Sequence, residues 1–236
     1  MRNAGTVDSL EKEGSAARVS LFDDLKITSI GLVFEQQAHA EGYRFVAGVD
    51  EVGRGCLAGP VVAGACILDP DKPLPKGLDD SKKLNAELRD EIATQLKTDC
   101  IAYAIGQVEA DEIDLINILE ATKKAMLMAI ASLTPQADFL LIDALRLKMS
   151  PLPQRAIIKG DTISASIAAA SILAKTYRDD LMKTYDIEYP QYGFASHKGY
   201  GATIHWTALR EHGHCPLHRL TFNGVLDQGK EDLPLF

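Results

Sequence analysis

Residues 163–185 are predicted to form one long helix, and the first half of this helix is built from unusually small side chains. These small residues are Ala165, Ser166, Ala168, Ala169, Ala170, Ser171 and Ala174. A helix covered with alanine and serine can approach a neighbouring sheet more closely than a helix covered with larger side chains. We therefore expect this helix to pack tightly against a central sheet, which restricts the chain to folds that combine helices with strands.

Five short apolar segments are predicted to supply the strands of that sheet. They cover residues 45–49, 61–68, 101–108, 139–142 and 155–158. Amphipathic helices are expected over residues 32–43, 85–97 and 113–133. The first two strands are expected to form a hairpin with an irregular turn, and two strands and the long helix follow the 113–133 helix. This order predicts an α/β fold, with a mixed five-stranded sheet flanked by helices.

The length of 236 residues suffices for one sizeable core and a small annex. We expect a disordered N-terminal extension, a main domain, a small helical C-terminal annex and a flexible tail. Their predicted boundaries are 1–28, 29–188, 189–224 and 225–236. The part of the chain after residue 190 holds five of the six histidines and the single tryptophan.

Charge and cysteine content bear on the cellular setting. The formal net charge of −8 is unusual for a nucleic-acid-binding protein, although it does not determine the local charge of a site. The four cysteines form no C-x-x-C pair, so reduced thiols are the simplest interpretation. The polar, acidic start does not look like a signal peptide, and no apolar run is long enough to cross a bilayer. We expect a cytoplasmic, monomeric protein that does not enter membranes.

Acidic residues stand at, or just beyond, the ends of three predicted strands. Asp50 and Glu51 follow the first strand, Asp143 follows the fourth, and Asp161 lies shortly after the fifth. Carboxylates that are crowded together repel one another unless cations neutralise them. Hard oxygen ligands suit Mg²⁺ or Mn²⁺, and two such ions can support an in-line displacement at phosphorus. Ordinary solvated acidic residues are the alternative, and they are common at strand ends.

Four histidines and a cysteine near the C-terminus superficially suggest a zinc site. They are His205, His212, His214, Cys215 and His218. Their spacing matches no standard structural zinc site. We expect instead that these histidines lie in loops near phosphate groups.

The order of several motifs resembles the ribonuclease HII family of bacteria. The first motif is Gly48-Val49-Asp50-Glu51-Val52-Gly53-Arg54-Gly55-Cys56-Leu57-Ala58-Gly59-Pro60-Val61-Val62, and the second is Leu78-Asp79-Asp80-Ser81-Lys82-Lys83-Leu84. Further along are Lys159-Gly160-Asp161, Ala169-Ala170-Ser171-Ile172-Leu173-Ala174-Lys175, His197-Lys198-Gly199-Tyr200-Gly201 and His218-Arg219-Leu220-Thr221-Phe222. The resemblance covers residues 31–224, which is nearly all of the chain expected to be ordered.

This resemblance implies an RNase H-like fold and an endonuclease that hydrolyses the RNA strand of RNA–DNA hybrids. It also implies cutting on the 5′ side of ribonucleotides embedded in duplex DNA, which leaves a 3′-hydroxyl and a 5′-phosphate. The main domain would be catalytic, with Asp50, Glu51, Asp143 and Asp161 holding two Mg²⁺ or Mn²⁺ ions in the substrate complex. The chain departs from the family pattern at Ala144, where glycine is usual, and this puts the local backbone in doubt.

Three further features are candidates for substrate binding. Gly53 and Gly55 permit close approach of the backbone to a 2′-hydroxyl, and Arg54 between them suits a phosphate. By resemblance, Tyr200 stacks on the sugar that follows the ribonucleotide, although a half-buried packing tyrosine is the ordinary alternative. Lys82 is a candidate phosphate contact, with a solvated lysine as its alternative.

Two other functions fit a carboxylate-rich chain. A 3′–5′ exonuclease usually starts from Asp-x-Glu, whereas Asp50 and Glu51 are adjacent here. A non-catalytic module that binds RNA–DNA hybrids would not need four carboxylates. A blocked 3′ end tests the first alternative, because an exonuclease stalls at it and an endonuclease does not. Metal-dependent turnover would exclude the second alternative.

The chain ends in Glu231-Asp232-Leu233-Pro234-Leu235-Phe236, which resembles the short peptides that dock on the replication sliding clamp. Leu233, Leu235 and Phe236 are the candidate anchors, because apolar side chains on a flexible tail suit a small apolar pocket. Packing of Phe236 on the body of the protein is the alternative. The segment 19–22, Val-Ser-Leu-Phe, is a rival docking segment.

Overall fold

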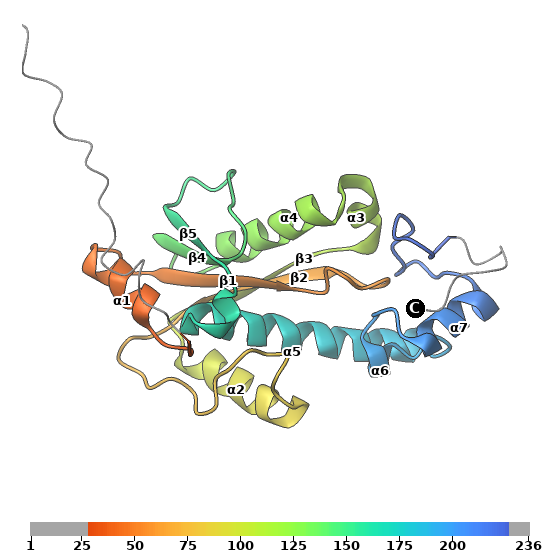
Figure 1. Ribbon diagram of the computed structural model, residues 1–236, viewed down its shortest axis with the longest axis horizontal. Helices are drawn as coiled ribbons and strands as arrows, with labels where there is room; N and C mark the ends of the chain where they lie inside the picture. Colours follow the sequence, from red (N-terminus) through yellow and green to blue (C-terminus); the bar gives the residue numbers. More distant parts are fainter. Residues whose placement is uncertain (1–27, 227–236) are drawn as a thin grey trace, which may run out of the picture.

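A mixed five-stranded sheet forms the centre of the computed structural model, which describes residues 28–226 (Figure 1). The strands lie in the order β3-β2-β1-β4-β5. Their bounds are Val46–Val52 for β1, Val61–Ile67 for β2, Ala102–Val108 for β3, Phe139–Asp143 for β4 and Gln154–Ile157 for β5. β1, β2 and β3 pair antiparallel, whereas β4 is parallel to both β1 and β5. The predicted α/β class and the five strands are confirmed, including the hairpin of β1 and β2.

Helices cover both faces of the sheet. In Figure 1, α3 and α4 lie above the sheet, and α2 and α5 lie below it. α6 lies beside the C-terminal end of α5 and α7 extends beyond it, and these two short helices form the predicted annex. The bounds are Val33–Ala40 for α1, Ala86–Asp99 for α2, Ala110–Ile116 for α3, Ile118–Ala131 for α4, Ala165–Glu188 for α5, Phe194–His197 for α6 and Thr203–His212 for α7.

The small-residue face of α5 packs directly on β1 and β2, as the sequence predicted. A Cβ atom added at Gly48 of β1 would stand 2.0 Å from the carbonyl carbon of Ser166. One added at Gly64 of β2 would stand 2.4 Å from the carbonyl oxygen of Ala170. The close approach therefore needs glycine on the sheet as well as small residues on the helix. It brings the N-terminal half of α5 under the acidic end of β1.

Most predicted elements end within a few residues of their observed bounds, and two differences bear on the site and on the packing. β1 does not finish before Asp50, because its pairing with β2 continues through Glu51 opposite Ala63 and Val52 opposite Val62. The expected single helix over 113–133 is two helices, α3 and α4. Asn117 breaks it with a φ of 67°, and its side chain accepts hydrogen bonds from the first turn of α4. The prediction of one helix was wrong because the apolar period continues across this break.

A buried carboxylate fixes the beginning of α5. Glu35 of α1 is 4% exposed, and its Oε1 accepts from the hydroxyls of Ser164 and Ser166, each at 2.6 Å. It also accepts from the backbone N–H of Ser166 at 2.9 Å. A negative charge is favourable at a helix N-terminus, where backbone N–H groups are otherwise unpaired. The long helix starts at Ala165, with Ser164 as its N-cap, shortly after a 3₁₀ turn over Gly160–Thr162.

Some predictions fall outside the described residues. These are the disorder of the N-terminal extension up to residue 27, the flexible tail from residue 227, and both candidate clamp-docking segments. Within residues 28–226, no helix combines the length and the apolar character needed to span a membrane.

Candidate active site

The sheet brings the four predicted acidic residues to one region. β1 and β4 are parallel neighbours in which Val49 stands opposite Ile142, so Asp50 and Asp143 follow side by side. Glu51 is the next residue of β1. Asp161 lies in the 3₁₀ turn after β5, and the backbone N–H of Gly160 in that turn donates to Asp143 Oδ1 at 2.7 Å. Two strands, β1 and β4, and the turn after β5 thus converge on a single carboxylate cluster.

Burial and mutual repulsion disfavour the charged forms of this cluster. Burial is the largest cause that raises the pKa of Asp50 well above its usual value, and the neighbouring Glu51 and Asp143 raise it further. Burial also raises the pKa of Glu51, although the hydrogen bond from Arg54 acts in the opposite direction. The pKa of Asp143 is raised by burial first, with Asp161 adding to the effect. Such a cluster is a favourable place for added positive charge.

Two basic side chains already neutralise part of the cluster. Arg54 Nη1 lies 3.2 Å from Glu51 Oε1, and Lys82 Nζ lies 3.0 Å from Asp161 Oδ2. The Lys82 side chain is 73% exposed, and its charge also acts on Asp143 and Glu51. Lys82 therefore lies at the acidic cluster, and no phosphate contact is needed to explain its position. Between residues 28 and 226, no three histidine, cysteine or acidic side chains are already close enough together to hold a metal ion.

One oxygen of the cluster has no partner within the protein. Glu51 Oε2 is buried and makes no hydrogen bond. A buried carboxylate oxygen without a partner is costly, so it is suited to a ligand that the site would bind. This oxygen is therefore available to a cation or to another ligand.

A serine of α5 supports Asp50, and the sequence did not single it out for this role. Ser171 is 5% exposed, and its hydrogen bond to Asp50 partly offsets the rise in the pKa of that carboxyl. The Ser171 hydroxyl lies 2.9 Å from the hydroxyl of Ser81. Since Ser171 donates to Asp50, Ser81 is the donor in the second bond. The signal available in the sequence was a hydroxyl inside a stripe that otherwise needs only small side chains.

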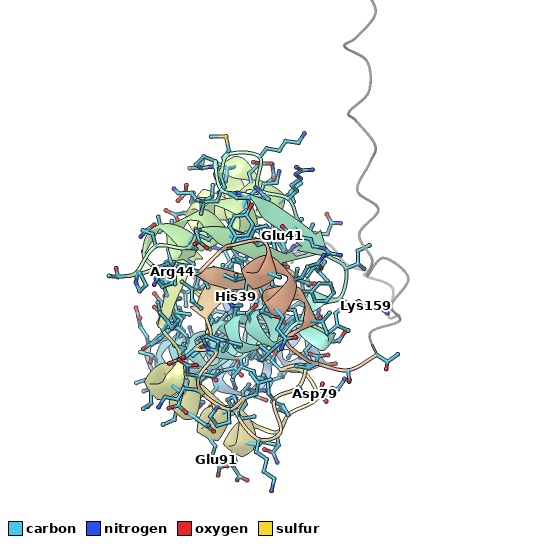
Figure 2. All side chains as sticks on the ribbon, turned by 90° about the vertical axis from the view of Figure 1, so that its left-hand side faces the viewer. His39, Glu41, Arg44, Asp79, Glu91 and Lys159 are labelled. Carbon is cyan, nitrogen blue, oxygen red and sulfur yellow. The ribbon has the colours of Figure 1, made fainter. Side chains whose placement is uncertain are left out.

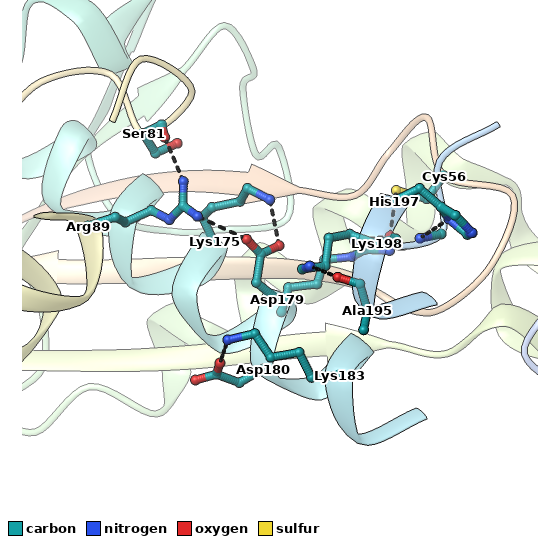
Figure 3. Close-up of polar contacts among 12 residues, drawn as sticks. Cys56, Ser81, Arg89, Lys175, Asp179, Asp180, Lys183, Ala195, His197 and Lys198 are labelled. Atoms are coloured by element: carbon teal, nitrogen blue, oxygen red, sulfur yellow. Dashed lines mark hydrogen bonds and ion pairs between the residues drawn. The ribbon is translucent and has the colours of Figure 1, made fainter. Parts of the chain in front are cut away.

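An ion network anchors the 78–84 loop that carries Lys82 (Figure 3). Arg89 Nη1 donates to the carbonyl oxygen of Ser81 at 3.1 Å, and Nη2 pairs with Asp179 at 3.1 Å. Lys175 pairs with the other oxygen of Asp179. Figure 2 views the α1 end of the molecule, where Asp79 of this loop and Lys159 lie on the same side. The network holds the loop against α5, on which Ser171 also lies.

Two fully buried arginines bind backbone carbonyl groups of the 54–60 segment, and sequence reasoning did not assign them this role. Arg178 donates to the carbonyl oxygens of Pro60, Ala58 and Lys198 at 3.0, 3.1 and 2.8 Å. Arg219 donates to the carbonyl oxygens of Arg54, at 2.9 Å, and Gly59. Burial lowers the pKa of Arg219 to about 10, so it stays charged at neutral pH. Neither arginine forms an ion pair with a carboxylate within residues 28–226. Their guanidinium groups instead donate to backbone carbonyl oxygens.

The two glycines of that turn have different reasons to be glycine. At Gly53 the φ is 90°, and an added Cβ would meet the guanidinium of Arg178 at 2.3 Å. At Gly55 nothing lies within 4 Å of an added Cβ. Packing thus explains Gly53, whereas the space beside Gly55 is open to a ligand.

Tyr200 lies on the same face as this turn. It is 43% exposed, and the backbone of its loop is tied to the turn by Leu57 N–H, which donates to the carbonyl oxygen of Gly199 at 2.8 Å. Burial raises the pKa of the Tyr200 hydroxyl, and the neighbouring Cys56 thiol adds to the effect. The Tyr200 loop is therefore bonded to the residues that directly follow the Gly53-Arg54-Gly55 turn.

Ala144 takes the backbone conformation that glycine would take more easily. Its φ is 49°, in the left-handed region, directly after Asp143. An L-residue in this region costs roughly 1–2 kcal/mol. The sequence left the backbone at Ala144 in doubt, because glycine is usual there in the family. The alanine adopts the left-handed conformation that glycine would take, with some strain.

The expectation that the C-terminal histidines lie in loops near phosphate groups is wrong for His205 and His218. His205 and His218 are buried inside the annex, and their Nε2 atoms lie 3.0 Å apart. His212 and His214 are exposed. The α7 helix carries the first of the buried pair inward because His205 lies on its apolar face with Ala208 and Leu209.

Comparison with known proteins identifies the family to which this arrangement of motifs belongs. The family described as ribonuclease HII matches residues 47–225, which contain all four carboxylates, the Gly53-Arg54-Gly55 turn and Tyr200. The chain belongs to the ribonuclease HII family. A ribonuclease HII of Syntrophotalea carbinolica is 52% identical over 194 residues, which are 82% of this chain and 92% of that protein.

Solved structures agree with the fold. The ribonuclease H2 of Pyrococcus horikoshii superposes with a TM-score of 0.65 at 26% identity, covering 78% of this chain and 97% of that one. The ribonuclease HII of Archaeoglobus fulgidus, solved in a complex with PCNA, gives a TM-score of 0.65 at 23% identity and covers 76% and 95% of the two chains. Ribonuclease HII proteins thus share this sheet and its flanking helices, and the fold is RNase H-like as expected.

Proposed function

We propose that this chain is a ribonuclease HII endonuclease that uses its carboxylate cluster to hydrolyse phosphodiester bonds. It cuts the RNA strand of RNA–DNA hybrids, and it cuts on the 5′ side of single ribonucleotides embedded in duplex DNA. The products carry a 3′-hydroxyl and a 5′-phosphate. Removal of misincorporated ribonucleotides and of RNA primers is the corresponding role. The convergence of Asp50, Glu51, Asp143 and Asp161 is the observation that carries this proposal.

The residues present fit divalent cations. Asp50, Glu51, Asp143 and Asp161 offer the hard oxygen atoms that Mg²⁺ and Mn²⁺ prefer, and the unpartnered Oε2 of Glu51 is one such atom. When two ions are bound, they supply charge neutralisation for an in-line displacement at phosphorus. No histidine or cysteine belongs to this set, which argues for a hard cation and against zinc.

The protein side chains would then divide the remaining tasks. Asp50 and Asp143 are held rigidly by neighbouring strands, and Ser171 fixes the orientation of Asp50. Arg54 and Lys82 pair with carboxylates in the present arrangement, but both are long and exposed. Once cations neutralise those carboxylates, the two basic side chains are free to contact phosphates of the substrate.

Selection for ribose is assigned to the surface formed by the Gly53-Arg54-Gly55 turn and Tyr200. The open space at Gly55 leaves its backbone within reach of a 2′-hydroxyl, which is the group that separates RNA from DNA. The half-exposed ring of Tyr200 stacks on the next sugar, where a deoxyribose fits best because it lacks that hydroxyl. A junction between ribose and deoxyribose is therefore the feature that this surface reads.

The decisive experiment offers a DNA duplex with one embedded ribonucleotide and maps the cut. We expect one cut on the 5′ side of the ribonucleotide in Mg²⁺ or Mn²⁺, and none in a chelator. A strand with a blocked 3′ end should be cut equally well. Stalling at that block would indicate a 3′–5′ exonuclease instead, and binding without turnover would indicate a non-catalytic module.

The last residues are assigned to the sliding clamp. Leu233, Leu235 and Phe236 would be the anchors, and the ribonuclease HII of Archaeoglobus fulgidus in complex with PCNA is a precedent for this kind of partner. Deleting residues 232–236 should abolish binding to a bacterial sliding clamp while cutting of short duplexes is unchanged. Retained clamp binding would favour residues 19–22, and lost cutting would favour packing of Phe236 on the body. The enzyme is expected to act as a cytoplasmic monomer, which light scattering tests.

A further inference from the structure

A row of hydrogen bonds crosses the interior of the C-terminal annex through two histidines. His205 and His218 are 0% and 2% exposed, and their Nε2 atoms lie 3.0 Å apart. The other nitrogen of His205, Nδ1, lies 2.9 Å from the carbonyl oxygen of Tyr200. The other nitrogen of His218, Nδ1, accepts from the backbone N–H of Cys215 at 3.0 Å. The two rings thus connect the backbone at Cys215 with the backbone at Tyr200.

The groups at the two ends determine where the protons are. A carbonyl oxygen only accepts, so His205 must carry a proton on Nδ1 to bond with Tyr200. Nδ1 of His218 lies 3.0 Å from the backbone N–H of Cys215, which only donates, and 3.3 Å from the carbonyl oxygen of Cys215, which only accepts. The contact between the two Nε2 atoms needs one proton, and a neutral His205 holds its proton on Nδ1, so a neutral His218 carries its proton on Nε2 and is bare on Nδ1. The central bond then runs from His218 Nε2–H to His205 Nε2. Both rings are neutral, and all three hydrogen bonds point from Cys215 towards Tyr200.

We infer that His205 and His218 are positioning residues for Tyr200, because their relay holds the carbonyl group of that residue. This inference rests on the proposed contact between the Tyr200 ring and the substrate. Lys198 and Gly199 both have positive φ, at 53° and 83°, so the loop that leads to Tyr200 turns sharply just before it. A fixed carbonyl at Tyr200 limits the directions in which its half-exposed side chain can leave that turn.

A third histidine extends the same design. His197 Nε2 donates to the carbonyl oxygen of Tyr192 at 2.8 Å, and its Nδ1 accepts from the backbone N–H of Gly199 at 3.2 Å. Its ring stacks on the ring of His205, with centroids 4.4 Å apart and an angle of 15°. The loop of Tyr200 is therefore held by one histidine on each side, through Gly199 and through its own carbonyl.

The surroundings favour the uncharged relay. Burial lowers the pKa of His205 to about 4, and the nearby His197 acts in the same direction. Burial and then His205 lower the pKa of His218 to about 4. The rings of Tyr192 and Phe194 also pack against the pair.

Titratable groups on the other side could only weakly favour a charged ring. Asp111 and Asp114 of α3 line a cavity of about 410 Å³ with His214, Cys215 and His218. Asp114 already accepts from the backbone of Leu220 and Thr221, so its charge is partly satisfied. A doubly protonated His205 would force His218 to carry its proton on Nδ1, directly against the N–H of Cys215. The uncharged relay avoids this conflict.

Nitrogen NMR of the full chain, labelled with ¹⁵N at histidine, tests the relay at neutral pH. We expect His205 to be protonated on Nδ1 and bare on Nε2, and His218 to show the reverse. Protonation of both nitrogens of His205, or a proton on Nδ1 of His218, would overturn the relay. This readout uses the unaltered protein and does not depend on nuclease activity.

Kinetics on the duplex with a single ribonucleotide test the positioning role. H205L removes the side-chain donor to the Tyr200 carbonyl oxygen and leaves the backbone N–H of Ala202, which also donates to it at 2.8 Å. The variant should raise KM several-fold, up to the roughly 5- to 150-fold that a lost stack is worth, with little change in kcat. H205N keeps an N–H near the place of Nδ1 and should recover most of this loss. The exposed His212 of the same helix supplies the control H212N, which should match the wild type.

An unchanged KM in a folded H205L chain, or a loss that H205N does not recover, would overturn the positioning role. If the unaltered chain does not cut this duplex at all, the proposed function fails, and the substrate role of Tyr200 fails with it. The NMR result separates the two cases, because the proton positions are measured without substrate.

Discussion

Acid is expected to destabilise this chain through its two buried histidines. Burial lowers the pKa of both His205 and His218 to about 4, whereas histidine in an unfolded chain titrates near 6.5. Below about pH 6.5 the unfolded state therefore binds more protons than the folded state. The folded state must then lose stability as the pH falls from 6.5 towards 4.

The size of the loss follows from these two pKa values. One histidine shifted from 6.5 to about 4 withdraws about 2 kcal/mol of unfolding free energy between pH 7 and pH 5. The two rings contact each other, so their titrations are coupled, and a charge on one ring opposes protonation of the other. Both rings stay largely neutral in the folded chain at pH 5, and the loss from the pair therefore approaches twice this figure. The carboxylates act oppositely, since the raised pKa of Asp50, Glu51 and Asp143 stabilises the fold as they become protonated.

Urea unfolding at pH 7 and pH 5, without metal, measures this effect when the wild type is compared with H205N. The carboxylate contribution is common to both chains and cancels in the comparison. The loss of unfolding free energy between the two pH values should be about 2 kcal/mol smaller in the variant. H212N, which changes an exposed histidine, should behave as the wild type. An equal pH dependence in wild type and H205N would refute the linkage reasoning.

Further perturbations test the site and the packing beneath it. D50N should reduce cutting at least about 100-fold. Because the buried charge is removed, D50N should also raise the unfolding free energy at pH 7 in a chelator. A less stable variant would contradict this electrostatic explanation. Y200A should lose about 1–3 kcal/mol of substrate binding, with a larger loss of cutting at one embedded ribonucleotide than on a long hybrid; equal losses in the nuclease assay would argue against junction reading. G48A should lower the unfolding free energy measured in urea by at least about 1–3 kcal/mol, because the added Cβ meets the backbone of α5. G31A is the control, since its added Cβ has nothing within 4 Å. Equal stabilities of the two variants would be inconsistent with the tight contact.

Local patterns determined much of the secondary structure from the sequence. The five apolar segments are the five strands, because alternation and apolar runs report burial within a single segment. The small residues of 165–174 already indicated a helix pressed against the sheet. The same local signal failed between α3 and α4, because Asn117 turns the chain while the apolar period on both sides continues.

Motif context determined which acidic residues to consider, but not how they are held. Asp50, Glu51, Asp143 and Asp161 stand next to distinctive neighbours in the chain, and for that reason they could be selected from 33 acidic residues. The raised pKa values of Asp50, Glu51 and Asp143 depend on burial and on neighbouring carboxylates, which are properties of the folded arrangement. The pairing of Lys82 with Asp161, 79 residues away, is likewise invisible in the sequence.

Only the tertiary structure decided the roles of the buried polar side chains. Nothing in the sequence indicates that Arg178 and Arg219 are fully buried, with Arg219 donating to the carbonyl oxygen of Arg54 and Arg178 to the carbonyl oxygen of Pro60. His205 and His218 suggested ligands, and the fold instead turned them towards each other. A polar side chain can be buried only where partners satisfy its hydrogen bonds, and here those partners are backbone groups brought close by the fold.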